Sequence, residues 1–174
     1  MDSRKRKLTV AAKHTCYILL MLLGYVQQTT PGLFTLWGIK PIWVVPLAVV
    51  ISAYEGEYIG ALYGMLAGLF WELAAGRIIG SFSVMMILLC FLTGVSIALY
   101  LRRTVLNLSL LSGFCLLLIG SADFVFSYWL QGYGAVSGVY FRQVLPTVIY
   151  SGACTFINVW LVKRIHAKFV YEDA

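Results

Sequence analysis

The sequence predicts an all-α integral membrane protein: a compact bundle of about six transmembrane helices with both termini in the cytoplasm. Its 174 residues are 61% hydrophobic and only 11% charged, whereas soluble domains carry roughly 25% charge. Apolar stretches recur along the whole chain, and one of them has a glycine or an acid at every fourth position. We therefore expect a single transmembrane domain over residues 1–174, without a separate soluble domain.

Charges, prolines and glycine clusters divide the apolar stretches into six spans, against a requirement of about 20 residues for each crossing. The predicted spans are residues 9–27, 41–54, 57–75, 81–101, 106–130 and 143–162. The first carries Lys13 and His14 near its cytoplasmic end, where long side chains can reach the headgroups. The second is short and contains Pro46, so we expect it to be kinked or only partly spanning.

The distribution of Lys and Arg orients this bundle. A cytoplasmic N-terminus and six spans place ten of the 13 basic residues inside and leave three outside, which are Lys40, Arg77 and Arg142. Cytoplasmic loops of membrane proteins carry such an excess of positive charge. An even number of spans then returns the C-terminus to the cytoplasm.

A ridge of small residues runs along the third predicted span, in the segment GEYIGALYGMLAGLFWELAAGRIIG. Its members recur at every fourth position: Gly56, Gly60, Gly64, Gly68, Glu72, Gly76 and Gly80. Such residues share one helix face, and without side chains they allow another helix in the lipid to come close. Each step of four advances about 400°, so the ridge drifts by about 40° and offers one edge to each of two crossing helices.

Two interpretations of this ridge stay open at the level of sequence. It can pack against helices of its own bundle, or it can be the contact surface for the helix of a partner protein. Gly76 and Gly80 lie beyond Glu72 and beside Arg77, and they are better explained as the helix end and the following loop.

Glu72 and Asp123 are the acids inside the predicted apolar spans. Both lie roughly 22 to 26 Å from the cytoplasmic end of their helix. A carboxylate in lipid is costly, so each should face the bundle or a basic neighbour from Lys40, Arg77 or Arg142. One interpretation is a polar anchor, in which case glutamine should replace Glu72 better than leucine; the other is contact with a partner or a substrate.

Residues for catalysis are not apparent. The chain lacks the H-E-x-x-H, G-x-S-x-G and phosphate-loop patterns, its four cysteines form no C-x-x-C pair, and its two histidines lie at the cytoplasmic rim. We therefore expect no enzyme activity, no metal and no cofactor. The net charge of +6 is explained by topology and by attraction to anionic headgroups, so nucleic acid is not an expected partner.

Residues 39–103, from IKPIWVVP to IALYLRR, resemble the rod shape-determining protein MreD family. The shared features are a segment with a proline, a stacked G-x-x-x-G helix that ends in G-L-x-x-[DE]-x-x-x-G, and a span closed by a basic pair. The matching positions are Gly64, Gly68, Leu69, Glu72, Gly76 and Gly80. The pattern extends to a glutamine pair after the first span and to Leu145 and Pro146 in the last one. Glu72 stands where many members have aspartate.

This resemblance implies a non-enzymatic scaffold of the cell-elongation machinery, which builds lateral peptidoglycan at the bacterial cytoplasmic membrane. The implied partners are an MreC-like protein, the MreB filaments, RodA and a class B penicillin-binding protein. The bundle also resembles the substrate-binding S-component of an energy-coupling-factor vitamin transporter, which is the alternative function. Such a component should present an outer pocket with several polar groups, and here the candidates are Glu72, Asp123, Ser121 and Asn158.

Overall fold

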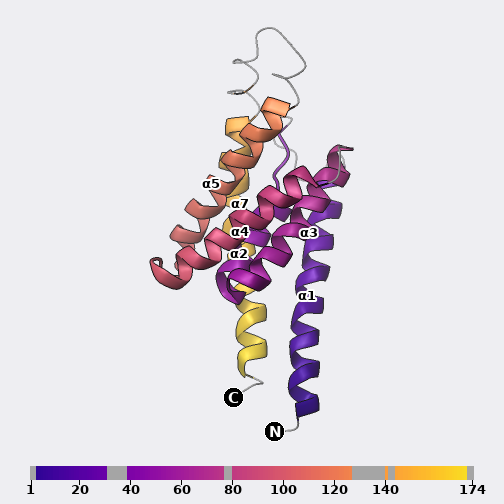
Figure 1. Ribbon diagram of the computed structural model, residues 1–174, viewed down its shortest axis with the longest axis vertical. Coiled ribbons are helices and arrows are strands. Elements are labelled where there is room, and N and C mark those ends of the chain that lie inside the picture. The colour runs from indigo at the N-terminus through magenta and orange to yellow at the C-terminus, as the bar shows by residue number, and fades with distance from the viewer. Residues whose placement is uncertain (1–2, 31–38, 77–79, 127–139, 141–143, 172–174) are drawn as a thin grey trace.

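The structure is a computed structural model that describes residues 3–30, 39–76, 80–126, 140 and 144–171. Within these residues the chain is all-helical (Figure 1). The six helices are α1 (Ser3–Thr29), α2 (Val44–Glu55), α3 (Glu57–Ala75), α4 (Ser81–Leu99), α5 (Val105–Phe124) and α7 (Leu145–Tyr171). The predicted all-helical class is therefore confirmed.

Four of these helices are long and apolar enough to cross a membrane, namely α1, α4, α5 and α7. Their candidate spans are Lys7–Thr29, Ser81–Leu99, Val105–Phe124 and Leu145–Phe169. The third predicted span has its full length in α3, with 19 residues, but α3 carries two glutamates and three glycines and is not among these four. The predicted residues 127–130 and 143 lie outside the described part of the chain.

Helix α2 lies at the centre of the bundle. It contacts all five other described helices, and its residues from Val44 to Ala53 are all buried. Twelve residues make about 18 Å of helix, which is shorter than the hydrocarbon core of about 30 Å. The extended segment before α2 is held to α7 by the Ile42 N–H, which donates to Ser151 Oγ at 2.8 Å.

Pro46 lies at the start of α2. It is the third residue of the helix, in the first turn, where a missing N–H leaves no intrahelical hydrogen bond unmade. The helix begins at Val44, three residues after the predicted Pro41, and its 12 residues agree with the expected segment that spans the membrane only partly.

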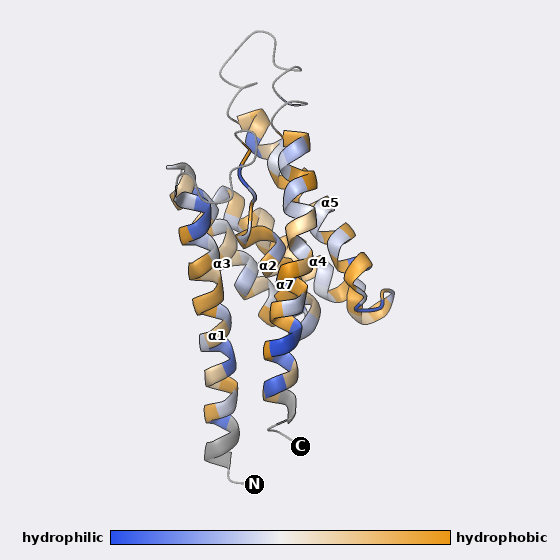
Figure 2. Cartoon of the chain, turned by 180° about the vertical axis from the view of Figure 1, so that it is seen from behind, coloured by the Kyte–Doolittle hydropathy of each residue, from blue (hydrophilic) through white to orange (hydrophobic). Residues whose placement is uncertain are grey.

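Helices α1 and α7 are both 27 residues long and extend beyond the shorter helices at the end where both termini lie (Figure 1). Helix α1 starts earlier and ends later than the predicted residues 9–27, and α7 ends later than the predicted residues 143–162. Figure 2 shows that hydrophilic residues gather on the described part of the α7 extension. A helix keeps its backbone hydrogen bonds in water as well as in lipid. The change from apolar to polar residues along the sequence therefore marks the membrane boundary and not the end of the helix.

Candidate functional site

The glycine ridge lies between α3 and two neighbouring helices of the same chain. Gly60 faces α2, where a Cβ would collide with Ser52. Gly64 faces α4, where a Cβ would lie 2.5 Å from the Met86 carbonyl oxygen and 2.9 Å from Cys90 Cβ. Gly68 faces the backbone of Ser83, at the start of α4. All three glycines are buried.

The ridge thus offers one edge to α2 and another to α4, as its drift around the helix predicted. The buried Ser52 hydroxyl completes this junction, because it donates to the Cys90 carbonyl and so joins α2 to α4. From the other side, Gly94 of α4 meets the Glu57 backbone at the start of α3. Because these surfaces are occupied by the chain's own helices, the structure does not leave the ridge from Gly60 to Gly68 open to a partner helix.

The outer members of the ridge are at helix junctions. Gly76 ends α3 in the left-handed conformation with φ of 62°, and Gly80 precedes α4 with φ of 121°. Side chains with a Cβ rarely adopt such angles. Gly56 separates α2 from α3. The interpretation of Gly76 and Gly80 as helix end and loop is confirmed.

Glu72 is completely buried, and its carboxylate caps the N-terminus of α4. Oε1 accepts from the backbone N–H groups of Phe82 at 2.6 Å and Ser83 at 3.1 Å. Oε2 accepts from the Gly80 N–H at 2.8 Å and from Ser83 Oγ at 2.9 Å. The first N–H groups of a helix have no partner inside it and carry partial positive charge, so a carboxylate there is well stabilised.

This arrangement supports the anchor interpretation of Glu72 but with different neighbours. We expected Asp123 or an arginine of the outer loops as the neighbour of Glu72. The groups that donate hydrogen bonds to its carboxylate instead belong to the start of α4. Arg77 and Arg142 lie outside the described residues. The sequence signal for this cap was available, because Glu72 precedes the first turn of the next helix by only eight to eleven residues.

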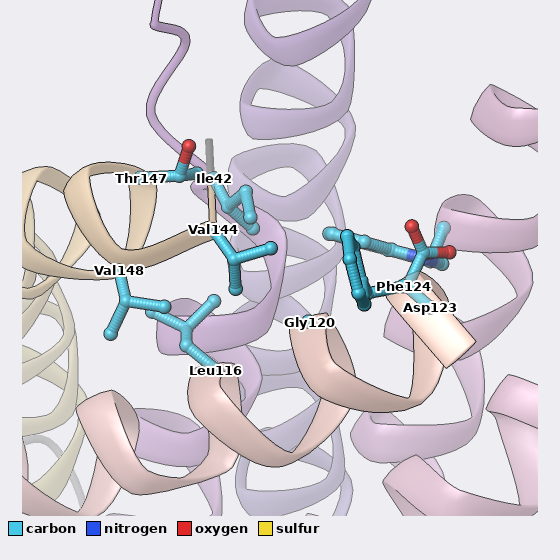
Figure 3. A pocket seen from close by; sticks show the side chains of 9 residues that line it. Ile42, Leu116, Gly120, Asp123, Phe124, Val144, Thr147 and Val148 are labelled. Atoms are coloured by element: carbon cyan, nitrogen blue, oxygen red, sulfur yellow. The ribbon is translucent and has the colours of Figure 1, made fainter. Parts of the chain in front are cut away.

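Asp123 lies near the end of α5 and is partly exposed. The indole N–H of Trp71 on α3 is 3.5 Å from its Oδ1. Beside it is a cavity of about 260 Å³ between α5, α7 and the segment before α2, with Ile42, Leu116 and Val148 in its wall. Figure 3 shows the carboxylate of Asp123 at the edge of this cavity and the apolar side chains within it. Among the described residues the lining of this cavity is mostly apolar, and its polar groups belong to Trp71, Asp123 and Thr147.

A second buried acid, Glu55, was not singled out from the sequence. Its side chain is only 5% exposed. Oε2 receives the Lys13 ammonium at 2.6 Å, and Oε1 receives the Tyr17 hydroxyl at 2.9 Å and lies 2.9 Å from His166 Nδ1. One carboxylate at the end of α2 therefore connects α1, α2 and α7. We call these four residues the Glu55 cluster.

Aromatic and basic side chains surround the Glu55 cluster. His14 Nδ1 lies 2.9 Å from the Tyr63 hydroxyl, which joins α1 to α3. The ring of Tyr54 lies 5.3 Å from that of His166, and the Arg103 guanidinium lies 5.8 Å from the Tyr54 ring centre. In the sequence, Glu55 lies between the second and third predicted spans. Lys13 within an apolar helix nevertheless indicates that an acidic partner is needed nearby.

Glu55→Gln should weaken the attachment of α1 to the bundle, because it leaves the Lys13 ammonium without its counter-charge. Lys13→Met should destabilise the protein through the same contact. In a double-mutant cycle, unfolding in detergent should give a coupling energy of about 1 kcal/mol between the two positions. The pair Glu55→Gln and Lys168→Met is the control, since Lys168 is exposed at the end of α7, and its changes should be additive. Additive effects for Glu55 and Lys13 would contradict the ion pair.

None of these clusters resembles catalytic machinery. Within the described residues, no group of three or more His, Cys, Asp or Glu side chains could hold a metal ion. Each cluster instead joins helices: Glu72 joins α3 to α4, and Glu55 joins α1, α2 and α7. The fold and these sites define a multi-pass helical membrane protein whose polar groups hold its helices together.

Residues 11–168 match the model of the rod shape-determining protein MreD family. The match covers nearly the whole chain, and the protein belongs to this family. It is therefore a non-catalytic protein of the bacterial inner membrane with a role in rod cell shape. No curated protein and no solved structure matches the chain.

Proposed function

We propose that this protein is a membrane scaffold of the cell-elongation complex and that it binds an MreC-like partner through intramembrane helix packing. MreB filaments, RodA and a class B penicillin-binding protein are the proposed further members of that assembly. The family membership supports this role. The construction of the bundle also supports it, because the buried acids Glu55 and Glu72 hold helices together.

The observation that carries the proposal is the exposure of α1. It is the least buried of the four candidate spans in the described chain. Its apolar side chains Leu19, Leu23 and Val26 are 56%, 65% and 56% exposed. Meanwhile its other face is fixed by Lys13 and Tyr17 to Glu55. A helix held rigidly on one side and bare on the other is a surface on which a second transmembrane helix can pack.

The ridge contributes to this surface indirectly. Gly60, Gly64 and Gly68 bring α2, α3 and α4 into close contact, and α1 packs against two of these helices, α2 and α3. We assign the partner contact to α1 and the internal packing to the ridge.

Purification from the native membrane in mild detergent tests the function. We expect an MreC-like single-span protein to be recovered with this chain in a defined ratio. Recovery of a vitamin-sized ligand together with a transport ATPase module would instead establish the S-component function and contradict the scaffold.

We further propose that the end of the bundle with both termini is cytoplasmic, on the strength of the ten basic residues assigned to it. Single cysteine tags near Lys7, at Arg103 and after Lys168 should then be shielded from a membrane-impermeant thiol reagent in intact cells. Tags near Gly38 and Gly134 should react. Labelling of the Arg103 tag from outside would contradict this topology.

A further inference from the structure

An apolar groove lies between α1 and α3, apart from the clusters described above. Its walls are His14 and Ile18 of α1 and Ile59, Leu62, Tyr63 and Leu66 of α3. It has a volume of about 280 Å³, and nearly all of its surface is apolar. Leu62 and Ile18 at its mouth are 59% and 43% exposed, so the groove opens to the lipid rather than into the bundle.

The dimensions of this groove suit a hydrocarbon chain. The α3 residues that line it extend over eight positions, from Ile59 to Leu66, a rise of about 10 Å along the helix. The groove, at about 280 Å³, has room for several methylene groups, each about the size of a water molecule.

The polar end of the groove coincides with the basic end of α1. His14, bonded to Tyr63, closes the groove on that side. Lys7 is exposed and lies seven residues before His14, which places it on the same helix face about 10 Å further out. Basic residues between helices at a membrane surface attract anionic headgroups.

Two acidic residues, Glu55 and Glu57, lie near the Lys7 end of the groove. Glu55 is buried and paired with Lys13 and His166. Glu57 belongs to the first turn of α3, and its backbone faces Gly94 of α4. The Glu55 charge is therefore compensated by its own partners and does not oppose an anion at Lys7.

We infer that the groove between α1 and α3 binds one acyl chain of an anionic phospholipid, whose phosphate lies against Lys7. The lipid fills the space between two helices that contact each other little. It thereby becomes part of the wall of the bundle. This inference does not depend on the identity of the protein partner.

Native mass spectrometry of the purified protein tests the inference, after exchange into nanodiscs of phosphatidylglycerol mixed equally with phosphatidylcholine. At a detergent concentration that removes bulk lipid, the protein should retain one phosphatidylglycerol. Leu62→Trp fills the groove from an exposed position and should reduce retention at least tenfold. Leu88→Trp is the control, because Leu88 on α4 is 60% exposed and does not line the groove. Lys7→Gln should abolish the preference for phosphatidylglycerol, whereas Lys168→Gln should preserve it.

A phosphatidylglycerol carrying a photoreactive acyl chain gives an independent measurement on the unmutated protein. Crosslinks should map to α1 near Ile18 and to α3 near Leu62. Equal retention by the unmutated protein and Leu62→Trp, or crosslinks spread evenly over α4 and α5, would overturn the groove as the site. Equal retention of the two lipids, or equal effects of Lys7→Gln and Lys168→Gln, would overturn the assigned headgroup contact.

Discussion

Gly68→Ala should destabilise the protein by about 2 kcal/mol, since an added methyl group overpacks the contact between α3 and α4. A Cβ at this position meets the backbone of Ser83 and the Phe82 carbonyl oxygen. Neither atom can move away as the end of a flexible side chain could, because both belong to the capped start of α4. Reversible unfolding in mixed detergent micelles, followed by circular dichroism, measures the change.

Gly113→Ala is the matched control for this experiment. Gly113 lies within α5, and a Cβ there has no atom within 4 Å to collide with. Alanine is also the better helix former by up to about 1 kcal/mol, so this variant should be neutral or slightly more stable. If Gly68→Ala and Gly113→Ala unfold alike, the close packing of the ridge does not stabilise the bundle.

Glu72→Gln should be nearly as damaging as Glu72→Leu, which differs from what the sequence suggested. The carboxylate accepts four hydrogen bonds, three from backbone N–H groups and one from the Ser83 hydroxyl. An amide has only one oxygen that can accept. Its NH₂ group can only donate, so it would face two of these donor groups without forming a hydrogen bond. Hydrogen bonds to charged groups contribute about 1.5–3 kcal/mol each, so we expect a loss of about 3 kcal/mol for Glu72→Gln.

The same unfolding assay measures the effect, with Glu57→Gln as the control. Glu57 is in the first turn of α3, and the structure shows no hydrogen bond to its carboxylate. This control should change stability by less than about 0.5 kcal/mol. Near-normal stability of Glu72→Gln would contradict the cap and would favour a carboxylate that needs only one hydrogen bond.

Hydropathy and glycine spacing predicted most of this fold. They located α3 with its observed bounds, Glu57–Ala75, and the two edges of its ridge. They did not predict which helix meets the ridge, because the spacing of small residues specifies a close contact and not its partner. The ridge pattern is the same for a helix of the same chain and for one of another chain.

The role of α2 escaped prediction for a physical reason. A short apolar helix has the same composition whether it enters the membrane partway or lies at the centre of a bundle. Its burial follows only from the five helices around it. Glu55 was missed for a related reason, since its partners Lys13 and His166 are 42 and 111 residues away in the chain.

Glu72 shows that identifying a residue and explaining it are separate steps. The cost of a carboxylate in lipid singled it out correctly. Its partners are mainly backbone N–H groups, which every residue except proline provides and which sequence letters therefore do not reveal.

The central claim, that this protein scaffolds the rod-shape machinery through the exposed face of α1, is tested most directly in a strain without the native gene. The strain would carry Leu19→Ala with Leu23→Ala on α1 or, as a control, Leu106→Ala with Leu110→Ala on α5, where the side chains are 67% and 65% exposed. Cell width and recovery of the MreC-like partner would be measured at equal protein levels. We expect the α1 variant to give rounded cells and at least tenfold less partner, and the α5 variant to give rods. Normal rods with full partner recovery in the α1 variant would contradict the account.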